Sequence, residues 1–417
     1  MHRAMIAAAA WLALAAPGTA RQEAPPEPLA LTEANVVDTR TGRVSAGATI
    51  LLREGRIESV ETTPPPAGVR AVSIAGRYVV PGLVDAHTHL STLRAAQTAL
   101  ESGVTTVRSS GVSAYVDVGL RELVRAGAVP GPDVLASGYH VRPRLAEEAF
   151  LTDPALAPLL RRGVRAATDL RRVVETNLAH KVDWIKVLAT ERAGTADTDP
   201  RRQVYGEAEL RAVVEAAGGT PVQAHAHGDE GARAAVRAGV RSIEHGTYLS
   251  EPTLALMKER GVFFVPTYTT VLDLLEPGGD YDQPALRLRG RHMAARLRET
   301  IRRAHRMGVK IVTGADTGYG PNSLTRISHE IVALAELGLT PLEALQAATT
   351  TAAELLRLER RIGQVAPGFE ADLIVVERNP LDDPRTLEDV LLVVSNGRIA
   401  LDRLGAAAPA PATDARR

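Results

Sequence analysis

The stretch VVPGLVDAHTHL at residues 79–90 decides the interpretation of the whole chain. Its apolar first half predicts a buried strand, and His87 and His89 follow where that strand ends. In an extended segment, side chains two residues apart point to the same side, so this pair suits joint binding of one metal ion. A single His-x-His pair often occurs by chance on a protein surface. This pair is more informative because a predicted buried strand comes directly before it.

Short apolar runs alternate with helix-periodic segments from residue 79 to residue 359, with 208–217 and 286–307 as examples of predicted helices. The runs that mark strands are 83–84, 104–107, 134–135, 184–188, 222–224, 242–243, 262–265 and 311–312. Eight strand–helix units over about 270 residues match the size of a TIM (β/α)₈ barrel. A doubly wound open sheet is the alternative, but no Gly-rich dinucleotide loop follows any of these strands.

The two flanks of the predicted barrel, 29–78 and 360–404, are rich in short β-like stretches. Examples lie at 34–38, 48–52, 371–376 and 390–394, and Asn396-Gly397 adds a hairpin signal. Neither flank alone has enough strands to bury a face, so we expect them to meet as one small β-sandwich. The Ala/Pro-rich tail at 405–417 is expected to be disordered.

The composition narrows the classes of partner and of metal ligand. Lys plus Arg number 49 and Asp plus Glu also number 49, so no charge excess favours nucleic acid or an anionic membrane. A small-molecule substrate is the expected partner, and a homo-oligomer is left open. The chain has no cysteine, which excludes disulfides, a thiolate nucleophile and cysteine-bound zinc. Metal ligands must therefore come from His, Asp, Glu or a modified Lys.

The first 20 residues have the pattern of a secretory signal peptide. Arg3 supplies positive charge, 5–16 is an apolar run, and Gly18-Thr19-Ala20 offers small residues for cleavage. The run is too short to span a bilayer, which needs about 20 apolar residues. The alternative is an Ala-rich helix of the mature protein. We expect a secreted or periplasmic enzyme with no membrane span.

The positions of the eleven histidines are the most informative feature of the sequence. The six that lie at or just past the ends of predicted strands are His87, His89, His140, His225, His227 and His245. In a (β/α)₈ barrel these strand ends converge on one face, where active sites are found. Structural histidines would instead be scattered among helices, as His180, His292 and His305 are.

Four motifs together resemble the amidohydrolase superfamily. They are VVPGLVDAHTHL, IEHG at 243–246, TGADTG at 313–318 and GFEADLIVVERNPL at 368–381. The resemblance extends over residues 31–402. LQAATTTAAELL and DWIKVLATERAG are similar to the imidazolonepropionase-like and prolidase-like group, which includes dipeptidases and carboxypeptidase-like enzymes.

The resemblance implies a centre with two divalent ions, expected to be Zn²⁺. Matching the family's motifs position by position gives the ligands His87, His89, Lys186, His225, His245 and Asp316. Lys186 would be carboxylated, because an unmodified ammonium repels a dication whereas a carbamate offers two oxygens. A lysine that is salt-bridged at a strand end is the alternative interpretation.

The resemblance also implies catalytic roles. Asp316 would accept a proton from the attacking water and return it to the leaving nitrogen, although an aspartate in a Gly-rich loop is most often a turn former. His227 and His140 would contact the substrate, with a plain loop histidine as the alternative for His140. The rim arginines able to pair with a substrate carboxylate are Arg142, Arg144 and Arg192. The alternative is that these side chains are simply solvated. Strand alternation predicts that Glu244 faces away from the barrel lumen, so we expect it to support a neighbouring ligand or to be structural.

The leading functional hypothesis is hydrolysis of an amide bond in dipeptides or N-acyl amino acids. The alternatives are a mononuclear cyclic amidohydrolase or deaminase, and a catalytically idle binding protein on the same fold. Lys186 argues against the mononuclear enzymes, because they usually lack it. Ser109 and His227 differ from the aspartate and tyrosine that the family often has there, so the sequence leaves the substrate open.

Overall fold

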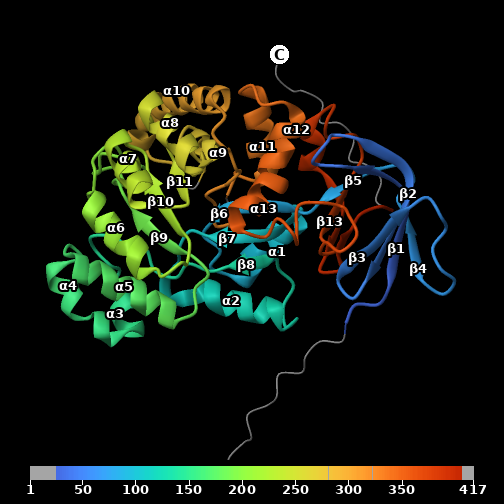
Figure 1. Cartoon of the computed structure of the whole chain (residues 1–417), viewed down its shortest axis with the longest axis horizontal. Coiled ribbons are helices and arrows are strands. Elements are labelled where there is room, and N and C mark those ends of the chain that lie inside the picture. Colours follow the sequence, from blue (N-terminus) through green and yellow to red (C-terminus); the bar gives the residue numbers. More distant parts are fainter. Residues whose placement is uncertain (1–24, 280, 322, 406–417) are drawn as a thin grey trace, which may run out of the picture.

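The computed structural model describes residues 25–279, 281–321 and 323–405 (Figure 1). The expected signal peptide and nearly all of the expected disordered tail lie outside these residues. Within the described ranges, no helix combines the length and the apolarity needed to cross a bilayer.

Parallel strands form two sheets in the central part of the chain. The first contains β6 (Leu83–Thr88), β7 (Val104–Ser109) and β8 (Asp133–Leu135). The second contains β9 (Ile185–Leu188), β10 (Val222–Ala226), β11 (Ser242–His245) and β12 (Phe263–Val265). Seven of the eight predicted strands are thereby confirmed. The eighth run, 311–312, makes only one isolated bridge, between Ile311 and Phe264.

Isolated parallel bridges connect the two sheets. Val141 pairs with Val187 of β9, Ile311 pairs with Phe264 of β12, and Thr317 pairs with Thr88 of β6. The parallel segments therefore follow the order of the chain, and the last lies beside the first, as in a TIM-barrel-like α/β fold. A closed ring of eight regular strands stays a prediction.

Helices cover the outside of the parallel sheets (Figure 1). They are α1 (Leu93–Glu101), α2 (Val116–Arg125), α3 (Glu148–Thr152), α4 (Pro158–Arg162), α5 (Ala167–Ala179), α6 (Glu207–Ala216), α7 (Asp229–Ala238), α8 (Glu251–Arg260), α9 (Tyr268–Asp273), α10 (Pro284–Met307), α11 (Ile327–Glu336), α12 (Pro341–Ala347) and α13 (Thr350–Leu356). The predicted helices at 208–217 and 286–307 are α6 and α10. Proline at the first position of α10 and Gly308 in the left-handed conformation after it explain where this helix begins and ends.

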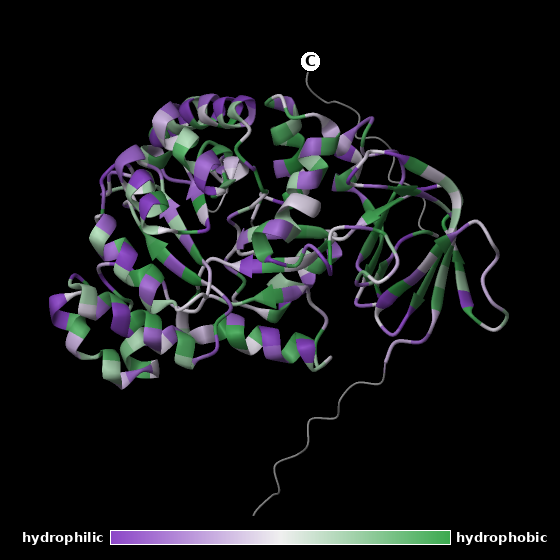
Figure 2. Cartoon of the chain, in the orientation of Figure 1, coloured by the Kyte–Doolittle hydropathy of each residue, from purple (hydrophilic) through white to green (hydrophobic). Residues whose placement is uncertain are grey.

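The two flanks meet in one mixed sheet, as expected. The N-terminal flank contributes β1 (Leu29–Val37), β2 (Val44–Arg53), β3 (Arg56–Glu61), β4 (Arg70–Ser73) and β5 (Tyr78–Pro81), and the C-terminal flank contributes β13 (Leu373–Val376), β14 (Val390–Ser395) and β15 (Arg398–Asp402). Antiparallel pairing of β5 with β13 joins the flanks. Their buried side chains form a separate apolar core, and green segments, the hydrophobic colour, alternate with purple ones along these strands in Figure 2. All eight strands belong to one sheet, so the two-layer sandwich stays a prediction.

Candidate metal centre

The strand ends carry the predicted metal-binding side chains. His87 lies in β6 and Lys186 in β9, and both are buried. His225 lies in β10, and His245 is the last residue of β11. Because parallel strands end at the same edge of a sheet, these residues are brought to one place although they are far apart in sequence.

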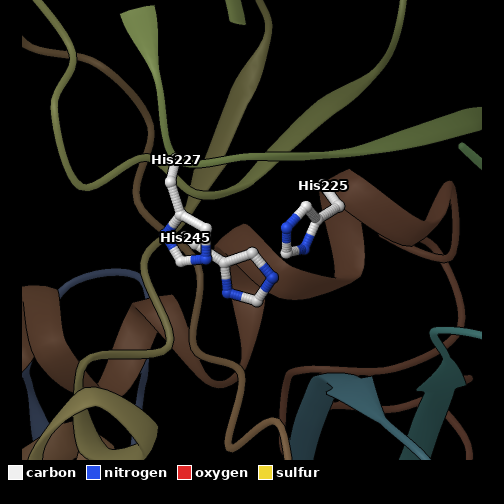
Figure 3. A group of neighbouring side chains, drawn as sticks. All are labelled: His225, His227 and His245. Atoms are coloured by element: carbon white, nitrogen blue, oxygen red, sulfur yellow. The ribbon is translucent and has the colours of Figure 1, made fainter. Parts of the chain in front are cut away.

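Two groups of possible ligands lie side by side and share His245. In the first, single ligand atoms of His225, His227 and His245 all lie within 4.8 Å of one another, and Figure 3 shows these three rings together. In the second, His87, His245 and Asp316 meet the same distance criterion. Asp316 Oδ1 also lies 3.1 Å from Nε2 of His89. The six predicted ligands, together with His227 and His140, line one cavity of about 50 Å³.

The position of His227 extends what the sequence predicted. Its ring is stacked on His245, with 4.7 Å between the ring centroids. Its Nδ1 forms a hydrogen bond with Oγ1 of Thr247 at 2.9 Å. His227 is therefore close enough to the other imidazoles to be a ligand, and its predicted contact with substrate stays a prediction.

Lys186 is the most unusual group in the cavity. Its side chain is 2% exposed, and its Nζ has no hydrogen-bond partner among the described residues. An ammonium group has three donors, and leaving them unmet in a buried site is costly. Burial lowers the pKa of Lys186 to about 8, although the carboxylates of Glu244 and Asp316 act in the opposite direction. The cavity therefore favours a neutral amine or a modified side chain at this position.

The electrostatics of the site keep three of its histidines neutral. Burial lowers the pKa of His87, His225 and His245 well below the usual value. For His87 the positive charge of Lys186 adds to the effect of burial. Neutral imidazole is the form that binds a metal ion, so the protonation state fits the predicted role.

Hydrogen bonds to the second ring nitrogen orient the histidines. His89 Nδ1 donates to the carbonyl of Gly111 at 2.8 Å. His245 Nδ1 lies 2.8 Å from Oγ1 of Thr267. Such partners fix both the tautomer and the direction of a metal-binding imidazole.

The expectation that Glu244 faces away from the lumen was wrong. Its Oε2 accepts a hydrogen bond from Nδ1 of His87 at 2.7 Å, and both oxygens accept from the buried guanidinium of Arg108. The backbone of His245 is left-handed (φ 71°), which breaks the alternation of sides at the end of β11. Glu244 thus orients His87, which agrees with the supporting or structural role expected for it, although the sequence reasoning missed the side to which it points.

The sequence reasoning also missed Asp85. Its Oδ1 accepts from the backbone N–H groups of His87 and Ala315, and its Oδ2 accepts from the hydroxyl of Tyr319. Burial raises the pKa of Asp85 to about 7. The carboxyl group joins β6 to the segment that carries Asp316, and so helps to place that side chain beside the histidines. The only available signal was its position two residues before the His-x-His pair.

The sequence profile of the amidohydrolase family matches residues 78–400. This chain belongs to the amidohydrolase family. Ochratoxinase from Aspergillus niger is 27% identical over 350 residues, which cover 75% of this chain and 72% of that protein. Imidazolonepropionase from Symbiobacterium thermophilum is 26% identical over 389 residues, which cover 80% and 84% of the two chains.

A solved structure of a Xaa-Pro dipeptidase with methionine bound in its active site gives a TM-score of 0.80. It is 27% identical in sequence, and the match covers 89% of this chain and 99% of that one. The resemblance inferred from the motifs is confirmed. The protein is a metal-dependent amidohydrolase, a hydrolase that acts on carbon–nitrogen bonds.

The remaining predicted residues lie at different places around the rim of this amidohydrolase site. His140 lines the same cavity, and its Nε2 lies 2.5 Å from the carbonyl oxygen of Ser110. Arg192 lines that cavity and a neighbouring one, and Arg142 lines only the neighbour. Arg144 is exposed and lines neither of the two. The three arginines that were grouped by sequence are therefore not equivalent.

Arg289 of α10 holds the loop that covers the cavity. Its guanidinium donates to the carbonyl oxygens of Ala193, Thr195, Ala196 and Thr198 at distances between 2.5 and 3.2 Å. Four acceptors from one short segment occupy the planar fork of the guanidinium, whose five donors are fixed in position. The loop lines the cavity beside the metal ligands. Arg289 therefore fixes one wall of the site without lining it.

Replacing Arg289 with alanine should loosen this loop while the rest of the barrel region stays intact. The amides of 193–198 are expected to exchange hydrogen at least about 10-fold faster, because the loss of several charge-assisted hydrogen bonds lowers the local opening free energy. Hydrogen exchange followed by mass spectrometry measures this. Arg291→Ala, at an exposed position of the same helix, is the control. Unchanged exchange in Arg289→Ala would show that the loop is held by other contacts.

Proposed function

We propose that this protein is a binuclear amidohydrolase that cleaves the amide bond of dipeptides or N-acyl amino acids. Two zinc ions would be held by His87, His89, a carboxylated Lys186, His225, His245 and Asp316. The observation that carries the proposal is the buried Nζ of Lys186, which lacks a partner in the cavity that the other ligands line. The proposal includes the closed eight-stranded barrel as the scaffold.

The donor set fits divalent ions. Imidazole nitrogen and carboxylate oxygen are the ligands that zinc takes in cysteine-free sites. Carboxylation of Lys186 would form a bond between its neutral amine and the carbon of carbon dioxide, with release of one proton to solvent. The product is an anion with two oxygens, so it removes the unmet donors and the positive charge together.

The mechanism assigns a separate task to each group of side chains. Bound divalent ions supply a water of low pKa and polarise the scissile carbonyl. The carboxylate of Asp316 accepts the proton of the attacking water and returns it to the nitrogen that leaves, because an amine leaves poorly as its anion. Glu244 and Thr267 keep the rings of His87 and His245 in place. The loop held by Arg289 forms part of the cavity wall.

The test is a screen of dipeptides and N-acyl amino acids with the purified, zinc-loaded protein. We expect turnover of some members and close to two metal ions per chain by elemental analysis. A mononuclear cyclic amidohydrolase or deaminase is the second candidate, favoured by the similarity to imidazolonepropionase. One ion per chain together with turnover of cyclic amides would select it. Bound metal with no turnover of any compound would indicate a catalytically inactive binding protein.

We also propose that the protein is exported, on the basis of the N-terminal signal pattern at 1–20. Sequencing the N-terminus of the protein purified from its native source should give a start just after residue 20. A mature protein that begins at Met1 and remains in the cytoplasm would contradict export. The metal chemistry does not depend on this outcome.

A further inference from the structure

A buried carboxylate on α11 contacts the helix α9, which forms part of the wall of the metal cavity. Glu330 lies in the first turn of α11 and is 0% exposed. Its Oε1 accepts a hydrogen bond from the backbone N–H of Tyr268 at 2.9 Å, and its Oε2 accepts from that of Thr269 at 2.8 Å. These are the first two amides of α9, and the first amides of a helix have no acceptor within the helix itself. No step of the proposed mechanism involves Glu330.

The carboxylate of Glu330 depends on these two amides. It forms no ion pair with any residue that the structure describes. Burial raises the pKa of Glu330 to about 7, and the hydrogen bonds from the two amides act in the opposite direction. A buried carboxylate that gave up these hydrogen bonds would be left unsatisfied, which is costly. The amides of Tyr268 and Thr269 are therefore held where Glu330 places them.

The residue just before these amides has a strained backbone. Thr267 adopts the left-handed conformation (φ 49°), which is unfavourable for a β-branched residue. Such a conformation persists only where the surrounding structure holds it. Because Glu330 fixes the two amides that follow, it restricts the direction in which the side chain of Thr267 points.

Two threonines at the start of α9 connect this placement to the candidate metal ligands. Oγ1 of Thr267 lies 2.8 Å from Nδ1 of His245, the histidine that the two groups of possible ligands share. Oγ1 of Thr270 donates to the carbonyl oxygen of Ala315 at 2.6 Å, directly before Asp316. Both threonines line the cavity. Loss of a hydrogen-bond partner on the second nitrogen of a metal-binding imidazole typically costs about 10- to 100-fold in metal affinity.

We propose that Glu330 is a positioning residue of the metal centre. By holding the first turn of α9, it keeps the hydroxyl of Thr267 against Nδ1 of His245 and so maintains the direction of that imidazole. Glu330 itself touches neither a metal ligand nor the substrate in this scheme. The inference rests on the proposed function and adds a residue outside the cavity that sets the affinity of the site for metal.

The experiment measures zinc affinity, by competition with a chromogenic chelator, in Glu330→Gln, Thr267→Val and the double variant. Glutamine keeps the size of the side chain but offers one acceptor oxygen to two N–H groups, and valine replaces the hydroxyl of Thr267 with a methyl group. Each single variant should bind the more weakly held ion about 10-fold less tightly or worse. The double variant should match Thr267→Val within about twofold, because both changes break the same connection. Glu336→Gln, at the exposed end of the same helix, should match the wild type.

Two results of this cycle would overturn the inference while leaving the proposed function intact. The first is unchanged zinc affinity in Glu330→Gln. The second is a double variant whose loss is the product of the two single losses, because that would indicate general damage to the fold rather than an action through Thr267. If the wild-type protein binds no zinc, the result counts against the proposed function itself.

A second readout needs only the wild-type protein, so it does not depend on the folding of a variant. Coupling between two sites is reciprocal, so bound metal should stabilise the first turn of α9 by the same factor by which that turn improves metal binding. The amides of 268–273 should exchange hydrogen about 10-fold more slowly in the zinc-loaded protein than in the metal-free protein, as measured by mass spectrometry. Equal exchange in the two forms would show that α9 and the metal centre are not coupled.

Discussion

Replacing Lys186 with methionine should lower kcat/KM by at least about 10³-fold and reduce the bound metal from two ions per chain to one. Methionine fills a similar volume but cannot react with carbon dioxide or offer oxygen ligands. The effect is expected to be large because a carboxylated Lys186 would supply oxygen ligands to the metal centre, and its terminal atom has no other partner among the described residues.

Two measurements separate this explanation from simple damage to the fold. Wild-type protein exposed to ¹³C-labelled carbon dioxide should show a carbamate signal by NMR, and Lys186→Met should not. Added acetate should restore part of the activity of Lys186→Ala, because a free carboxylate supplies the missing oxygens. Lys258→Met, at an exposed position on α8, should match the wild type. Full activity in Lys186→Met would end the carbamate proposal.

The positions of the candidate metal-binding residues at the strand ends could be predicted because they depend on local pattern. The apolar runs before His87, His225 and His245 do form β6, β10 and β11, and the ends of parallel strands meet. A period-two pattern fixes which residues share a side, so the His-x-His pair was informative from the sequence alone. The family motifs then supplied Lys186 and Asp316, which no spacing rule would have selected.

The failures have a different physical origin, because backbone irregularities do not follow from residue periodicity. The run at 311–312 does not continue as a strand toward Asp316, whose backbone is left-handed (φ 46°). A Cβ atom at Gly314 would lie 2.7 Å from Cβ of His87, so only glycine allows this segment to approach β6. The backbone of His245 is also left-handed, which explains why strand alternation gave the wrong side for Glu244.

Long-range side-chain contacts could also not be predicted from the sequence. Arg289 contacts a loop that lies 91 to 96 residues earlier in the chain, and the next arginine on α10, Arg291, is exposed. Nothing in the local sequence distinguishes Arg289 from Arg291. Only the fold brings the four carbonyl groups to one guanidinium.

Replacing Asp316 with asparagine should leave the metal content near two ions per chain but lower kcat by roughly 10²- to 10⁴-fold. Asparagine keeps the shape of the side chain and one carbonyl oxygen as a ligand, but an amide does not accept a proton near neutral pH. The oxygen Oδ1 of Asp316 lies 3.1 Å from Nε2 of His89 and 3.5 Å from Nε2 of His87, so the carboxylate is within reach of the groups that we propose as ligands of the reacting centre.

The pattern of kinetic constants identifies the role that is lost. A group that acts only in proton transfer lowers kcat with little change in KM, whereas a lost ligand lowers the metal content as well. Elemental analysis and steady-state kinetics on the same preparation distinguish the two cases, with Asp389→Asn, at an exposed position in the C-terminal flank, as the control. A near-normal kcat in Asp316→Asn would remove Asp316 from proton transfer, and loss of metal would restrict its role to binding. Retained metal with a slow chemical step is the result that the geometry around His87, His89 and His245 leads us to expect.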